Sequence, residues 1–82
     1  MPKRKYRAPA YIVERMAELA LLSNGWHNGD GRKIKRSSMR AAHERFREYA
    51  GPRVHLYPTI EGRIQAEFAP TLLGYQHQDE IL

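Results

Sequence analysis

The sequence contains no cysteine, and it has only one tryptophan and two phenylalanines beside five tyrosines among its 82 residues. Without cysteine, a disulfide framework and a thiolate metal site are both excluded. No apolar run approaches the roughly 20 residues that a membrane span requires. No apolar signal segment follows the basic N-terminus. We therefore expect a cytoplasmic protein without a membrane partner, whose single small domain is stabilised by packing or by a partner.

Acidic residues are scarce in the first half of the chain. Residues 1–40 contain ten lysines and arginines but only three acids, whereas residues 41–82 contain four bases and six acids. The formal net charge is +5. This asymmetry favours an anionic partner, either a phosphate backbone or an acidic protein surface. A high isoelectric point is also common in small soluble domains that bind no nucleic acid, so both interpretations stay open.

A glycine-rich segment, residues 23–32 (SNGWHNGDGR), separates two helix-like patterns. Its glycines at 25, 29 and 31 alternate with asparagine and aspartate, which predicts a loop with repeated positive φ angles. We assign a structural role to Gly25, Gly29, Gly31 and Trp26. The loop is expected to bury the indole against a set of apolar side chains from both helices and the hairpin, namely Leu19, Leu22, Phe46, Ile64 and Phe68.

Apolar residues at spacings of three and four predict two amphipathic helices. The first begins near Pro9 and ends at residues 23–25. The second is expected to begin with Ser37 or Ser38 as its N-cap and to end at Gly51 and Pro52. The residues that mark the two apolar stripes are Ile12, Met16, Leu19, Ala20 or Leu22 in the first helix and Met39, Ala42, Phe46 and Tyr49 in the second.

The apolar period changes from helical to two after residue 52. Residues 53–57 and 63–68 alternate between apolar and polar side chains, which predicts an antiparallel hairpin closed by a turn with Gly62 at its positive-φ position. Residues 71–82 form either a third strand or an extended tail. The fold class is therefore α+β, with a basic flexible arm at 1–8 and one domain at 9–70. The open hairpin edge predicts a third strand or a homodimer.

No motif for catalysis or cofactor binding is present. The glycines fit neither a calcium loop nor a nucleotide-binding loop. The four histidines, at 27, 43, 55 and 77, are too widely spaced to indicate a metal site. Glu61 and Glu67 are more plausible as turn and strand residues than as an acid/base pair. We expect no catalytic residue, no metal and no cofactor, and we do not expect an enzyme.

The remaining candidate site is a set of basic side chains from the N-terminal arm and from the start of the second helix. Free N–H groups at a helix N-terminus, next to bases, can bind a phosphate. The predicted partner-binding or phosphate-binding residues are Lys3, Arg4, Lys5, Arg32, Lys33, Lys35, Arg36 and Arg40.

Two segments carry a resemblance to a known group. Residues 24–31 (NGWHNGDG) and 57–68 (YPTIEGRIQAEF) resemble small uncharacterised proteins of bacterial genomes and their phages, which have D/N-G-W-x-x-G-x-G followed by P-T-x-E-G-x-I-x-x-E-W/F. Arg63 stands where a second glycine is usual in that pattern. No established activity belongs to the group, but the resemblance implies a phage or mobile-element setting, in which short proteins commonly bind a host macromolecule.

The sequence thus favours a small basic non-enzymatic accessory protein that binds a host macromolecule, most plausibly a protein. The alternative is a sequence-tolerant nucleic-acid-binding protein that uses Lys3–Arg7 and Arg32–Arg40. Salt dependence distinguishes the two, because binding to phosphates weakens steeply with added salt.

Overall fold

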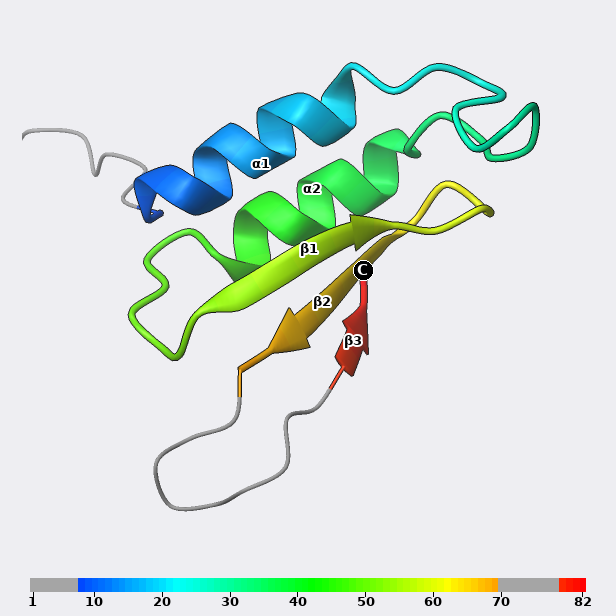
Figure 1. The fold of residues 1–82 in the computed structure, drawn as a ribbon. Coiled ribbons are helices and arrows are strands. Elements are labelled where there is room, and N and C mark those ends of the chain that lie inside the picture. Colours follow the sequence, from blue (N-terminus) through cyan, green and yellow to red (C-terminus); the bar gives the residue numbers. More distant parts are fainter. Residues whose placement is uncertain (1–7, 70–78) are drawn as a thin grey trace, which may run out of the picture.

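The computed structural model describes residues 8–69 and 79–82, which form two helices and a three-stranded antiparallel sheet. The elements are α1 (Ala10–Ala20), α2 (Arg36–Arg45), β1 (Val54–Pro58), β2 (Ile64–Phe68) and β3 (Asp79–Ile81). Both helices lie on the same face of the sheet (Figure 1). The α+β class is confirmed. The arm with Lys3, Arg4 and Lys5, and most of the predicted tail, lie outside the described residues.

The first helix follows its predicted stripe but is shorter than expected. Ile12, Met16 and Leu19 are buried on its inner face. Pro9 is the N-cap, and its carbonyl accepts hydrogen bonds from the N–H groups of residues 12 and 13. The helix ends at Ala20, before the predicted end at residues 23–25, and the Leu21 N–H turns back to the Glu18 carbonyl at 3.1 Å.

The prediction that a serine caps the second helix is wrong. The helix begins at Arg36 with Lys35 as its N-cap residue, and no side chain caps it. Ser38 instead lies inside the first turn with only 4 % of its surface exposed. The regular helix ends at Arg45, before the predicted end at Gly51 and Pro52, because residues 46–48 form a turn.

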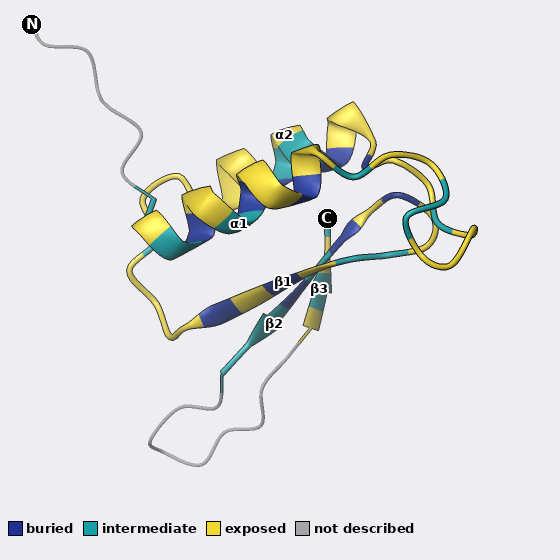
Figure 2. Cartoon of the chain, turned by 45° about the horizontal axis from the view of Figure 1, so that its top comes forward, coloured by how far each residue is buried: buried dark blue, intermediate teal, exposed yellow. Residues whose placement is uncertain are grey.

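Strand alternation places one face of the sheet against the helices. In β1 and β2 the buried residues are Val54, Leu56, Ile64 and Ala66, whereas His55 is exposed between them. Figure 2 shows the buried sides of helices and sheet turned toward each other. The core consists of ten apolar side chains, Ile12, Met16, Leu19, Ile34, Ala42, Phe46, Val54, Leu56, Ile64 and Ala66.

The third strand forms on the free side of the hairpin. β3 pairs antiparallel with β2, with Ile81 opposite Gln65 and Glu80 opposite Ala66. The strand order is therefore β1-β2-β3, so the edge of β2 is filled by the chain's own residues. The three residues assigned to β3 lie at the end of the predicted 71–82 segment, and residues 70–78 lie outside the described part.

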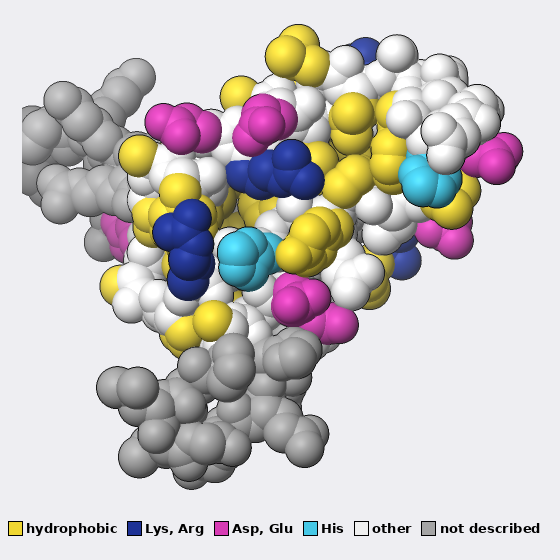
Figure 3. Space-filling model, in the orientation of Figure 1, with side chains coloured by type: hydrophobic (Ala, Val, Ile, Leu, Met, Phe, Trp, Pro, Cys, Tyr) yellow, Lys and Arg dark blue, Asp and Glu magenta, His cyan; other side chains and the backbone are white. Residues whose placement is uncertain are grey.

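The opposite edge of the sheet is covered by α1. The Tyr11 hydroxyl accepts a hydrogen bond from the Val54 N–H at 3.1 Å, and the Arg15 Nε donates to the Leu56 carbonyl at 2.9 Å. Pro58, at the end of β1, has no backbone N–H and so cannot donate a hydrogen bond at this edge. A shallow hollow of about 360 Å³ lies between α1 and β1, and Figure 3 shows charged and histidine side chains on this face of the molecule. These contacts leave little of β1 available to an added strand.

Candidate functional site

The glycine-rich segment forms a closed loop held by its own backbone. The Gly25 N–H donates to the Gly31 carbonyl at 2.7 Å, and the His27 N–H donates to the Asp30 carbonyl at 2.7 Å. All three loop glycines have positive φ, and so does Asn28. The predicted need for left-handed backbone in this loop is therefore confirmed.

Trp26 lies within the loop, and the prediction that it packs into the core is wrong. Its side chain is partly buried, and its Nε1 donates to the Arg32 carbonyl at 2.9 Å. A Cβ at position 31 would lie 2.7 Å from the indole ring, so the glycine permits the ring to rest on the backbone. The loop therefore folds over its own tryptophan, because a loop carbonyl, that of Arg32, accepts the hydrogen bond of the indole N–H. The predicted neighbours Leu19, Phe46 and Ile64 instead belong to the core.

The loop is joined to the turn of the β1–β2 hairpin. The Arg32 N–H donates to the Ile60 carbonyl at 2.9 Å, and the Lys35 N–H donates to the Gly62 carbonyl at 2.8 Å. A Cβ on Gly62 would lie 2.7 Å from the Lys33 carbonyl oxygen, so this close approach also requires glycine. Residues 23–35 and the turn at residues 58–63 therefore form one end of the molecule (Figure 1), which we call the loop end.

The loop end and the adjoining start of α2 carry the basic side chains that the sequence singles out. Five of them, Arg32, Lys33, Lys35, Arg36 and Arg40, are exposed. The ion pairs among residues 8–69 and 79–82 involve Arg15, Arg45 and Arg47 and none of these five. Their charge is therefore not neutralised within the described structure and is available to an anionic partner.

Sequence reasoning missed two members of this surface. Arg63 is exposed just before β2, and it lines a hollow of about 370 Å³ together with Lys35, Ser37, Ser38, Ala41 and Leu82. Ile60, in the hairpin turn, has 52 % of its surface exposed. In the sequence, Arg63 is visible only as a base at the end of the predicted hairpin turn. Ile60 could be assigned to this surface only from the structure, in which its carbonyl accepts a hydrogen bond from the Arg32 N–H and its side chain is exposed.

At the start of α2, the N–H groups of Arg36 and Ser37 have no hydrogen-bond partner among the described residues. No acid lies in its first turn, although acids there normally stabilise a helix N-terminus. Lys35 and Arg36 occupy the N-cap and first helical positions. This arrangement favours an anion from outside the chain.

The histidines of the described part of the chain lie apart from one another, and so do Glu61 and Glu67. Within residues 8–69 and 79–82, no three histidine or acidic side chains gather so that they could hold a metal ion. His27, His43 and His55 are exposed on three different elements. Glu61 is exposed in the hairpin turn, whereas Glu67 lies within β2 opposite His55.

No family model, curated protein or solved structure matches this chain. Among the described helices, none is long and apolar enough to cross a membrane.

Proposed function

We propose that this chain is a non-enzymatic accessory protein that binds an acidic protein surface through its loop end. The observation that carries the proposal is the set of exposed cations whose charge no described acid neutralises, next to the exposed side chain of Ile60. Arginine around an apolar residue is a composition typical of protein interfaces.

The backbone of the loop end is already ordered, which favours binding. Hydrogen bonds within the loop and between the loop and the hairpin turn fix residues that would otherwise have to be ordered on association. Binding through such a surface loses less conformational entropy than binding through a flexible loop. The cations supply attraction at long range, and the exposed side chain of Ile60 supplies apolar contact area beside Arg32.

The test is affinity capture with the purified full chain from a nuclease-treated lysate of the native cell. The quadruple variant Arg32→Ser, Lys33→Ser, Lys35→Ser and Arg36→Ser is expected to lose the captured protein, and so is Ile60→Ser. The matched control is Leu21→Ser, which removes another apolar side chain, 85 % exposed, from the end of α1. This control is expected to capture as well as the parent chain.

Nucleic acid is the competing partner for the same bases. It would be indicated by direct binding of duplex or single-stranded oligonucleotides, with a slope of log affinity against log salt near −4 for four or five phosphate contacts. In that case Ile60→Ser would leave affinity unchanged, because a phosphate contact needs no apolar centre. Capture that survives the quadruple substitution would contradict both partners at this surface.

A further inference from the structure

The outer edge of β3 exposes backbone N–H and C=O groups that could pair with the same groups of a second β3 strand. Ile64 and Leu82 exchange both of their backbone hydrogen bonds, at 3.2 and 2.7 Å. Because bonding direction alternates along an antiparallel strand, Glu80 also faces β2, whereas the N–H and C=O groups of Asp79 and Ile81 point away from the sheet. Those four groups have no hydrogen-bond partner among the described residues. The Ile81 side chain is 48 % exposed.

The two edges of the sheet differ sharply. At β1, Tyr11 and Arg15 already occupy two of the outward backbone groups, and Pro58 has no N–H to offer. β3 is therefore the edge that can accept another strand. A chain with one such edge forms a closed pair by strand addition, whereas a chain with two would form a fibre.

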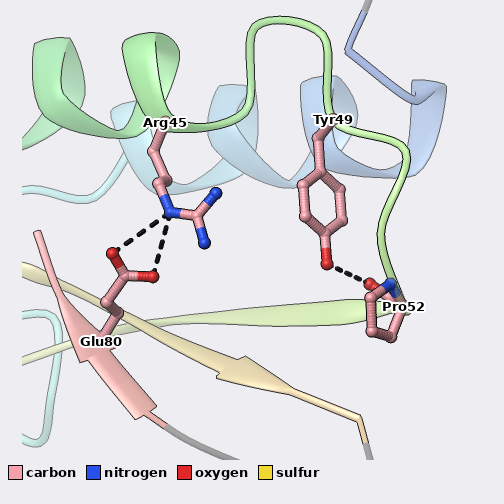
Figure 4. A network of polar contacts seen from close by, with 4 residues as sticks. All are labelled: Arg45, Tyr49, Pro52 and Glu80. Atoms are coloured by element: carbon pink, nitrogen blue, oxygen red, sulfur yellow. Dashed lines mark hydrogen bonds and ion pairs between the residues drawn. The ribbon is translucent and has the colours of Figure 1, made fainter. Parts of the chain in front are cut away.

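The acidic side chains of β3 are held by residues of their own chain. The Gln65 Nε2 donates to the Asp79 Oδ2 at 3.1 Å. The Arg45 Nε donates to both Glu80 carboxylate oxygens, at 3.2 and 3.0 Å (Figure 4). These contacts reduce the repulsion that two acidic edges would otherwise exert on each other.

We propose that β3 pairs with β3 of a second copy of this chain, antiparallel and centred on Glu80. In this register Asp79 of each copy lies opposite Ile81 of the other, and all four outward backbone groups on each strand are satisfied. The hollow beside the end of β3 is lined by Leu82, by the small side chains of Ser37, Ser38 and Ala41 on α2, and by the longer side chains of Lys35 and Arg63.

Cross-linking tests the register directly, because the chain has no cysteine of its own. The two Glu80 side chains would face each other as a non-hydrogen-bonded pair, with Cβ atoms about 4.5 to 5.5 Å apart, close enough for a disulfide after a small adjustment. Glu80→Cys is expected to form a covalent dimer on mild oxidation. Glu14→Cys, on the outer side of α1, is the control and is expected to remain uncross-linked at the same protein concentration.

Sedimentation over a concentration series tests the pairing without a cross-link. Ile81→Pro removes an outward N–H and leaves the β2–β3 hydrogen bonds in place, so the dimer dissociation constant is expected to rise at least tenfold. Ile81→Val keeps the N–H and is expected to dimerise like the parent chain. A monomeric parent chain up to millimolar concentration, or an absence of the Glu80→Cys dimer, would overturn the proposal. The Ile60→Ser variant, which the proposed function expects to lose its partner, lies outside the hollow beside β3 and should dimerise normally, so failure here is distinguishable from failure of the proposed function.

Discussion

Gly29 and Gly31 share almost the same backbone angle, with φ of +92° and +93°, but only Gly31 lies against another side chain. A Cβ at position 29 would meet nothing within 4 Å, whereas one at 31 would meet the Trp26 ring at 2.7 Å. Gly29→Ala should therefore cost about 1 to 2 kcal/mol of unfolding free energy, the ordinary penalty of a left-handed residue. Gly31→Ala should cost clearly more, because the indole must also move. Urea denaturation measures both, and equal costs would contradict this account of the loop.

The indole N–H of Trp26 contributes to stability through its bond to the Arg32 carbonyl. Trp26→Phe keeps an aromatic ring and removes that bond, so we expect a loss of about 1 kcal/mol. Tyr57→Phe is the control, because Tyr57 lies exposed on the open face of β1, and it should change little. A loss well above that value for Trp26→Phe would instead indicate the core position that the sequence suggested.

Arg45 connects α2 to β3 through an ion pair and also through contacts of its guanidinium with aromatic rings. Its guanidinium lies 5.4 Å from the centre of the Phe46 ring and 5.1 Å from that of Phe68, while its Nε bonds Glu80. Arg45→Ala should cost about 1 to 2 kcal/mol, because ring contacts add to an ion pair that is weak by itself.

Hydrogen exchange at the Leu82 amide should also become faster in Arg45→Ala. The control is Arg47→Ala, since Arg47 reaches Glu44 only at 4.0 Å and at an exposed position. Similar effects of the two substitutions would show that the ring contacts contribute nothing.

Tyr49 makes stability depend on pH in the alkaline range. Burial, with a smaller effect from nearby Tyr11, raises the pKa of the Tyr49 hydroxyl above its usual 10.0, although Arg45 acts in the opposite direction. The folded chain therefore holds this proton more tightly than the unfolded chain does. Its contribution is fully present below the unfolded pKa and is lost as pH rises through the folded pKa.

The substitution Tyr49→Phe isolates this contribution. The Tyr49 hydroxyl also donates to the Pro52 carbonyl (Figure 4), so ionisation removes a hydrogen bond. The parent chain should lose stability as pH rises above the ordinary tyrosine pKa of 10.0, and the variant should lose less over the same range. Denaturant midpoints across that range measure the difference, and identical slopes would contradict it.

The spacing of apolar residues in the sequence predicted the fold class, because the side chains at those positions are the ones that the structure buries. The inward residues of α1 and the alternating residues of both hairpin strands lie where the pattern places them. The errors concern features that are decided by particular hydrogen-bond partners, which a periodic pattern does not show. The indole N–H of Trp26 donates to the Arg32 carbonyl, six residues away within the loop, and not to a group in the core. The second helix begins directly after Lys35, whose N–H donates to the Gly62 carbonyl, and not after a capping serine.

The candidate site was only partly predictable for the same reason. Composition identified the cluster of bases at residues 32–40, since charge is visible without structure. It could not show that Ile60 and Arg63 would join that cluster, because their place beside the glycine loop depends on hydrogen bonds between segments from opposite halves of the chain. The expected contribution of Lys3, Arg4 and Lys5 stays a prediction.

The junction between the glycine loop and the hairpin turn also constrains the order in which the molecule assembles. During synthesis, residues 23–35 leave the ribosome before residues 58–63, so the backbone bonds that Arg32 and Lys35 donate have no acceptors at first. Contacts between distant segments form slowly, because the intervening chain must first be ordered. The loop end is therefore completed only after the hairpin is in place. A truncated or half-folded chain carries the same bases but does not hold them in the arrangement that a partner would recognise.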